Sequence, residues 1–485
     1  MKTGSLVKIV TLIVVTGLPG LVRGQEASDL DKLKSTVESL QQTIKSMQQT
    51  IEQQNQKISD LEKGQKAAAP AIAAPAVGGT GGVEVVTITP APKEVVGHAS
   101  PIEDRSNFND EQTSVPRPND QTLDPKYRGY IPVPNTPVVM KFNAKPRLDA
   151  MSDTRNSGDP DRFVTAKIPV EGESGFGGPE QFNINARGSQ LKWDVRTPDM
   201  PGNFRFYYEN DFFGSGSGMQ YRLRYLYGQY YNFTIGQAAS VFQDPDAWPD
   251  TVDYEGPNGG ILTRRPLARY TWLINPQWQL NLSVEQPSSE VSSTNSITQQ
   301  NRAPDGGFNI RWEKANVGHV QYGMIFRDVG AESAGFGTQD VFGWGASLSS
   351  SFKVFEKDSV QEQVTYGEGV FKYCNDDFVN NDAAFAHDGD LEPIPFFGSM
   401  VGYTHQWSDA FRSTASFGYV HLNNFGSQGP TAYYQTYYSS ANLIWQMRKR
   451  LTLGLEGLWG YKEEQSGQVG DVWRVQLSAK YSLFD

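Results

Sequence analysis

The sequence lacks what a disulfide-stabilised domain or a helical membrane domain would need. Cys374 is the only cysteine among 485 residues, which excludes an intrachain disulfide. After residue 25, no window approaches the roughly 18 continuous apolar residues that a transmembrane helix requires. Hydrophobic residues make up 38% of the chain and the mean hydropathy is -0.51, yet 12% of the residues are aromatic. This combination favours a β-rich protein.

The sequence also lacks the charge and the motifs of several function classes. A net charge of -11 and a pI near 5.1 argue against a general nucleic-acid binder. No GxSxG or HExxH motif occurs, and no metal-ligand spacing relates the five histidines, which are His98, His319, His387, His405 and His421. We therefore predict no catalytic residue, no metal site and no cofactor. The alternative is an enzyme whose Ser, His and acid converge from distant positions, testable by hydrolase assays on lipid or ester substrates.

The N-terminal region divides into three segments. Lys2 and Lys8 precede an apolar run that Pro19 breaks and that is too short to span a bilayer, so residues 1–24 are predicted to be a signal peptide, with an uncleaved anchor as the alternative. Heptads follow, with one core position carrying Leu30, Val37, Ile44, Ile51 and Ile58 and the other Leu33, Leu40, Met47, Gln54 and Leu61. They predict an oligomerisation coiled coil over residues 25–64 of at least two chains, without fixing the number. A Pro/Ala/Gly-rich linker is predicted for residues 65–134.

From residue 135 to the end, apolar and polar residues alternate with a period of two. In VVMKFNAKPRLDAM, Phe142 and Leu148 lie on the apolar register, and Pro146 predicts an irregular strand or a site that needs no N–H. In a later segment, Met219, Tyr221, Leu223, Tyr225 and Tyr227 oppose Gln220, Arg222 and Arg224. About sixteen such segments, joined alternately by short turns and long loops, predict an all-β fold, a transmembrane antiparallel barrel over residues 135–485.

The two faces of the predicted sheet differ in chemistry. One face is charged across many strands, and no helical layer is available to cover it; the other is crowded with aromatic residues. A large sheet also needs closure to remove its edges, so we place the aromatic face in lipid and the charged face around water. A soluble sandwich or propeller is the alternative. The chain ends on the amphipathic strand VWRVQLSAKYSLFD, whose terminal Asp485 departs from the aromatic end that outer-membrane assembly machinery is expected to read.

Several stretches resemble the DcaP-like trimeric porins of Gram-negative outer membranes. They are INARGSQLKWDVRTP, GNFRFYYENDFFG, LRYLYGQYYNFTIGQAASVFQDPDAWPDTVDYEGPNGG and RRPLARYTW, in that order. The resemblance implies a homotrimer in the outer membrane, with a periplasmic coiled coil and three separate pores. It also implies small solutes as partners, with a leaning toward anions such as dicarboxylates.

The charged register predicts a basic pore wall, opposite in sign to the whole chain. Its bases are Lys141, Lys145, Arg147, Lys192, Arg196, Arg205, Arg222, Arg224, Arg265, Arg269, Arg311, Arg327, Arg412, Arg474 and Lys480, and its acids are Asp149, Asp194, Glu209, Asp211, Glu313 and Glu456. We place the basic side of a constriction at Arg205, Arg222, Arg224, Arg265 and Arg269. Its acidic side is an inward loop with Asp244, Asp246, Asp250 and Asp253. The alternative is that neighbouring acids neutralise these arginines and only stiffen the wall.

These expectations define a porin for small polar solutes, favouring anions. The alternative function is structural, with the coiled coil tethering the envelope. Deleting residues 26–64 separates the two, because conductance would persist if the helix serves only assembly or anchoring.

Overall fold

The computed structural model describes residues 107–109, 129–198, 202–293, 296–379 and 381–483. All of them belong to one compact unit, residues 93–485. The predicted signal peptide and coiled coil, and most of the predicted linker, lie outside the described residues. None of the helices in the described ranges has the length and apolar character to cross a membrane.

The described part of the chain is all-β and mostly antiparallel, arranged as one 20-stranded sheet and one 3-stranded sheet. The large sheet contains β1 (Ile131–Pro132), β2 (Val139–Lys145), β3 (Arg147–Asp153), β4 (Gln181–Asn185), β5 (Gln190–Arg196), β6 (Arg205–Asp211), β7 (Arg222–Tyr230), β8 (Phe233–Ala239), β9 (Arg264–Asn275), β10 (Trp278–Glu285), β12 (Ile297–Gln300), β13 (Asp305–Lys314), β14 (Gly318–Ser333), β15 (Gly337–Val354), β16 (Asp358–Glu368), β19 (Pro395–Gln406), β20 (Phe411–Leu422), β21 (Tyr433–Arg448), β22 (Leu451–Glu464) and β23 (Val469–Tyr481). The small sheet contains β11 (Val291–Ser292), β17 (Ala383–Phe385) and β18 (Leu391–Pro393). Short 3-10 helices are η3 (Thr165–Lys167), η4 (Pro245–Ala247), η5 (Phe371–Tyr373) and η6 (Gly426–Gln428).

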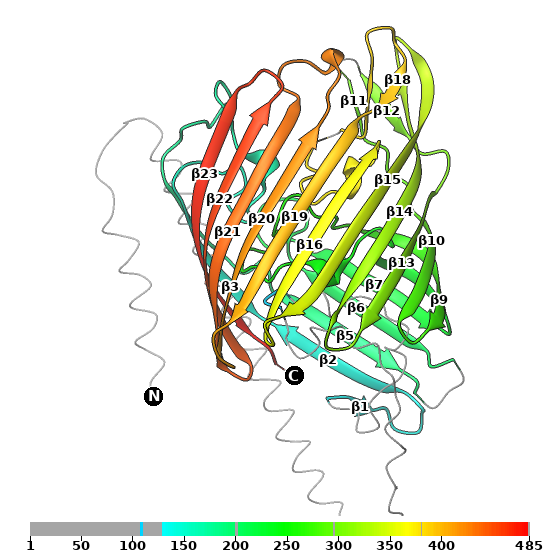
Figure 1. Ribbon diagram of the computed structural model, residues 1–485, viewed down its shortest axis with the longest axis vertical. Coiled ribbons are helices and arrows are strands. Elements are labelled where there is room, and N and C mark those ends of the chain that lie inside the picture. The colour runs from blue at the N-terminus through cyan, green and yellow to red at the C-terminus, as the bar shows by residue number, and fades with distance from the viewer. Residues whose placement is uncertain (1–106, 110–128, 199–201, 294–295, 380, 484–485) are drawn as a thin grey trace, which may run out of the picture. The chain divides into compact units, whose positions relative to one another are not determined.

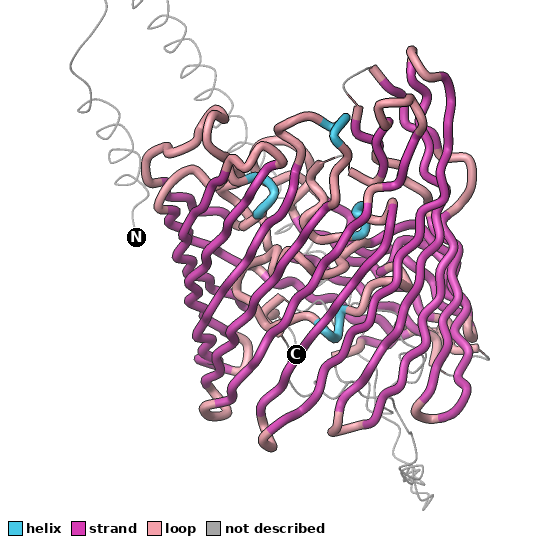
Figure 2. Tube along the Cα trace, turned by 45° about the horizontal axis from the view of Figure 1, so that its top comes forward, coloured by secondary structure: helices cyan, strands magenta, loops and turns pink. Residues whose placement is uncertain are grey.

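Strands that follow one another in the chain pair side by side through most of the large sheet (Figure 1; Figure 2). The ladders run from β5 to β10, from β10 to β13, from β13 to β16, from β16 to β19, and on to β23. β23 then pairs with β3, and β2 pairs with β5. The last strand of the chain therefore lies beside one of the first.

Pro146 marks the break between β2 and β3. Its missing N–H costs no ladder bond there, while its carbonyl accepts the N–H of Tyr481 at 3.0 Å. The following N–H, that of Arg147, donates to the Ser189 side chain at 3.0 Å. The irregular first strand predicted from this proline is confirmed.

The two faces of the large sheet differ in exposure. One face carries apolar side chains that are exposed, and the other carries charged side chains that are buried. Leu148 is 53% exposed, whereas its neighbours Arg147 and Asp149 are 3% and 2% exposed. At the other end of the chain, Leu477 is 55% exposed and Arg474 only 1%. A soluble protein shows the reverse pattern, so this sheet has its apolar face against a nonaqueous environment.

Almost all bases of the predicted charged register lie on the buried face of the sheet. Buried are Arg147, Lys192, Arg196, Arg205, Arg224, Arg265, Arg269, Arg311, Arg327, Arg412, Arg474 and Lys480. Lys141, Lys145 and Arg222 are half-buried.

The predicted register was wrong in the second half of β7. The pairing of β6 with β7 shifts between Glu209 and Asn210, so Arg224 is an extra residue in the ladder. A bulge of this kind moves all later side chains to the opposite face. Tyr225 and Tyr227, predicted to face lipid, are instead buried on the charged face with Tyr207.

Candidate functional site

The long connection between β8 and β9 lies against the charged face of the sheet. Gly259 allows a close approach, because a Cβ there would lie 2.1 Å from the Ser399 carbonyl oxygen and 2.5 Å from that of Tyr419. Within the connection, Asp244 caps η4 by accepting the N–H of Asp246. We call residues 240–263 the inward loop.

The first two loop acids bind the wall at β13 and β14. Arg311 donates to Asp244 at 3.1 Å and to Asp246 at 2.6 Å. His319 lies 2.8 Å from the Asp244 carboxylate, and Ser349 donates to it at 2.6 Å. Burial alone would raise the pKa of Asp244, but His319 and Arg311 hold it well below its usual range. This end of the loop is fixed by charge.

The next two loop acids bind elsewhere on the wall. Asp250 accepts from Arg412 of β20 at 2.5 Å, and its carbonyl accepts from Asn442 of β21 at 2.8 Å. The N–H of Asp253 donates to Glu456 of β22, while its carboxylate accepts the Gly256 N–H at 2.8 Å. The four acidic residues thus fasten the loop to β13, β14, β15, β20, β21 and β22.

The five predicted constriction arginines do not share one set of partners. Arg222 and Arg224 lie together, both on Asp211, with Arg224 also 2.6 Å from Glu209. Arg205 pairs with Asp194 at 3.0 Å and lies over the Tyr207 ring.

The remaining two arginines lie on β9. Arg265 is 3.6 Å from Asp305, with its guanidinium 4.3 Å from the centre of the Tyr373 ring. Arg269 is buried further along the strand. Four of the five predicted arginines thus pair with acids of the sheet, whereas the loop acids bind Arg311 and Arg412.

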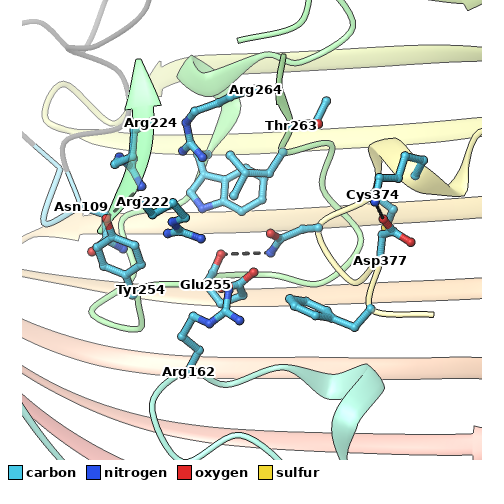
Figure 3. Close-up of a pocket in the computed structure, with 15 residues that line it drawn as sticks. Asn109, Arg162, Arg222, Arg224, Tyr254, Glu255, Thr263, Arg264, Cys374 and Asp377 are labelled. Carbon is cyan, nitrogen blue, oxygen red and sulfur yellow. Dashed lines mark hydrogen bonds and ion pairs between the residues drawn. The ribbon is translucent and has the colours of Figure 1, made fainter. Parts of the chain in front are cut away.

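A cavity of about 240 Å³ lies where the inward loop meets β7 and β9 (Figure 3). It is lined by Asn109, Arg162, Arg222, Arg224, Trp248, Tyr254, Glu255, Leu262, Thr263, Arg264, Lys372, Cys374, Asn375, Asp377 and Phe378. Five of these side chains are basic and two are acidic. The acids that pair with Arg222 and Arg224 lie behind them, because Asp211 and Glu209 are fully buried and do not line the cavity.

Three of the lining bases, Arg162, Arg264 and Lys372, were not predicted from the sequence. Arg162 lies in the connection from β3 to β4, and Lys372 lies in η5, so neither belongs to an alternating strand. Arg264 starts β9 on the register opposite to Arg265. Of these three bases, only Arg264 had a signal in the sequence, because it stands next to the predicted Arg265.

Lys372 is held in its charged form by two carboxylates. Burial alone would lower the pKa of Lys372, but Asp377, 3.0 Å away, and Glu290 raise it above its ordinary value. The cavity therefore keeps this positive charge across the neutral pH range.

The predicted wall residues of the first strand differ in their surroundings. Arg147 donates to Asp149 at 2.8 Å and to the Val252 carbonyl at 2.6 Å, so it joins the wall to the inward loop. Lys141 and Lys145 are half-buried on β2 and do not line the cavity.

The stability of the folded protein should depend on pH through the buried carboxyl group of Asp253. Burial raises its pKa from 3.8 to about 6, against the opposing charge of Arg474 and with a further increase from Glu255. Because the folded-state pKa exceeds the unfolded one, the stabilisation is fully present below pH 4 and is lost as the pH rises through 6. The free energy of unfolding should fall by up to about 3 kcal/mol over this range from Asp253 alone.

Urea titrations in detergent micelles between pH 4 and pH 7.5 measure this slope. Asp253→Asn should flatten it, whereas the fully exposed Asp409→Asn should not change it. An unchanged slope in Asp253→Asn contradicts the prediction.

Comparison with known proteins identifies the family and the fold. The model of the family described as DcaP outer membrane protein matches residues 126–483. A crystal structure of the outer membrane channel DcaP of Acinetobacter baumannii has a TM-score of 0.64 and 23% sequence identity, covering 71% of this chain and 97% of that chain. This likeness shows a shared fold.

Two further structures are more distant. A trimer form of OmpT of Vibrio cholerae has a TM-score of 0.43 at 11% identity, covering 71% of this chain and 99% of that chain. OprB of Pseudomonas putida has a TM-score of 0.45 at 10% identity, covering 71% of this chain and 94% of that chain. No curated protein sequence matches the chain.

Proposed function

The chain belongs to the DcaP outer membrane protein family, and from this premise we propose that it forms a water-filled diffusion channel for small polar solutes that favours anions. The observation that carries the anion preference is the lining of the cavity at the inward loop. Five bases face that space against two acids, while Asp211 and Glu209 lie behind their arginines. A solute in the cavity would meet guanidinium groups first.

The pairing of strands supports a closed barrel of about sixteen strands. Joining β2 with β3, and β4 with β5, as single interrupted strands gives sixteen strands with two neighbours each, because β23 pairs with β3; the short β1 and β12 add to β2 and β14. Closure would place the buried charged face around the lumen and the exposed apolar face in lipid. The inward loop would then cross the lumen as the constriction.

A homotrimer fits the heptads, which require at least two chains, and the family resemblance, which supplies the number three. The predicted coiled coil would lie in the periplasm, ahead of the barrel. Its residues lie outside the described ranges, so this part of the proposal stands on the sequence. We propose no enzymatic activity.

Ion selectivity tests the proposal directly. In planar bilayers under a tenfold KCl gradient, the reversal potential should have the sign of anion preference. Arg222→Gln should shift it toward cations, because Arg222 is a half-buried base at the cavity. The control Arg302→Gln removes an equal charge from an exposed pair with Asp340 outside the cavity lining, and should leave the potential unchanged. Cation preference of the unmodified channel would overturn the anion proposal.

A further inference from the structure

Three residues from the predicted linker lie against the wall of the barrel domain, two of them buried and the third half-buried. They are Asn107, Phe108 and Asn109, which we call the docked tripeptide. Phe108 is 1% exposed and Asn107 is 9% exposed. A linker composition predicts solvated residues, so this burial requires a specific explanation.

The Phe108 ring occupies an apolar socket in an otherwise charged wall. It packs with Val252 of the inward loop and Ile444 of β21. Gly454 of β22 leaves the necessary space, because a Cβ there would lie 2.6 Å from Val252 Cγ2 and 3.2 Å from Phe108 Cε2. The Arg147 guanidinium and the Lys480 ammonium each lie 5.1 Å from the ring centre, so cations border the socket.

The backbone of the docked tripeptide joins the loop to the wall. The N–H of Phe108 donates to Asp250 Oδ1 of the inward loop at 2.6 Å. Its carbonyl accepts from Lys480 Nζ of β23. One residue therefore connects the loop with the last strand.

Asn109 makes a second connection of the same kind. Its Nδ2 donates to the Asp253 carbonyl of the loop at 2.7 Å. Its Oδ1 accepts from Arg147 Nη1 of β3 at 2.5 Å. Asn109 also lines the cavity, beside Tyr254 in Figure 3. The docked tripeptide thus forms part of the surface that a solute would meet.

We propose that the docked tripeptide is an internal strap that fixes the inward loop to β21, β22, β23 and β3, and so sets the width of the pore. This inference rests on the proposed function, because it takes the cavity as part of the pore. It assigns Phe108, Asn109 and Lys480 as positioning residues for the constriction. The occupant of the socket is a segment of this same chain. Its Phe108 ring packs in the apolar socket, its Phe108 N–H binds Asp250, and its Asn109 amide binds the Asp253 carbonyl.

Conductance tests the pore-setting role. Phe108→Ala should raise the mean single-channel conductance roughly 1.5-fold and increase the open-channel noise, because the loop loses its apolar anchor. Gly454→Ala should have the same effect by filling the socket from the wall. Gly457→Ala is the matched control on the same strand, since a Cβ there meets nothing within 4 Å. Retained gel mobility of unheated samples shows that each variant is folded.

Cysteine labelling tests docking without relying on conduction. Asn107→Cys should react with a membrane-impermeant maleimide at least tenfold more slowly than Ser466→Cys, an exposed control. Adding Gly454→Ala should remove this protection. All labelling variants carry Cys374→Ser, because the buried Cys374 lines the cavity. Equal labelling rates would overturn docking, and protected Asn107→Cys with wild-type conductance in Phe108→Ala would overturn the pore-setting role. A folded wild-type protein without conductance would instead contradict the proposed function. The labelling rates would still test whether the docked tripeptide is docked.

Discussion

Arg474→Met is expected to destabilise the protein by about 3 to 5 kcal/mol, because it leaves a buried carboxylate without its cation. Arg474 is 1% exposed and donates to both oxygens of Asp153, at 2.6 and 2.8 Å. It also donates to Ser157 at 3.1 Å and to the Asp159 carbonyl at 3.0 Å. This side chain therefore fastens β23 to β3, the ladder that joins the end of the sheet to its beginning.

The same ladder provides a matched control. Arg155 and Asp471 form an ion pair at 3.0 Å, but their side chains are 42% and 39% exposed. Arg155→Met should cost less than about 1 kcal/mol, since exposed pairs are screened by water.

Urea unfolding in detergent micelles, followed by tryptophan fluorescence, compares the two variants. Equal stabilities for Arg474→Met and Arg155→Met would contradict the argument. Adding Asp153→Leu to Arg474→Met should recover most of the loss, because it removes the unpaired carboxylate.

The two faces of the sheet were predictable because their signal is local. A period of two assigns Leu148 and Arg147 to opposite faces without knowledge of any partner. The same reasoning failed at Tyr225, because the extra residue Arg224 in the ladder leaves no mark in the pattern of apolar and polar letters. A bulge depends on the pairing of two strands, and the sequence of one strand does not contain it.

The site was predictable in composition and much less in its contacts. Four acids in a long connection indicated a loop with a role, yet their partners are far away in the chain. Arg311 binds Asp244 across 67 positions and Arg412 binds Asp250 across 162. Arg162 and Lys372 enter the cavity from two other connections, where no periodicity marks them. Which bases line the cavity therefore depends on contacts between residues that are distant in sequence, and the topology of the sheet determines those contacts.

The pairing also bears on why a basic lining can coexist with a stable wall. Buried guanidiniums without partners would be costly, and Asp211 and Glu209 lower that cost for Arg222 and Arg224 without lining the cavity themselves. Under the proposed function, the five lining bases would give the cavity a positive potential, reduced by these acids. The alternative of full neutralisation differs from this arrangement only in selectivity, which the reversal potential measures.

Arg311→Met is expected to widen the channel, because it releases the loop segment around η4. Arg311 is 4% exposed and serves three carboxylates, Asp244 at 3.1 Å, Asp246 at 2.6 Å and Glu313 at 2.8 Å. Without it, Asp244 keeps His319 and Ser349, but mutual repulsion favours moving the loop acids into water. The single-channel conductance should rise about twofold, and the largest polyethylene glycol that enters the pore should increase.

A graded series separates charge from geometry in this prediction. Arg311→Lys keeps the charge, but an ammonium lacks the planar fork that reaches three carboxylates, so its conductance should fall between those of the wild type and Arg311→Met. Lys314→Met, at the exposed end of the same strand, should conduct like the wild type. If Arg311→Met lowers the free energy of unfolding yet leaves both conductance and polymer exclusion unchanged, the inward loop does not limit the pore. If conductance instead rises from the wild type through Arg311→Lys to Arg311→Met, the constriction lies where Arg311 binds Asp244 and Asp246 of the inward loop.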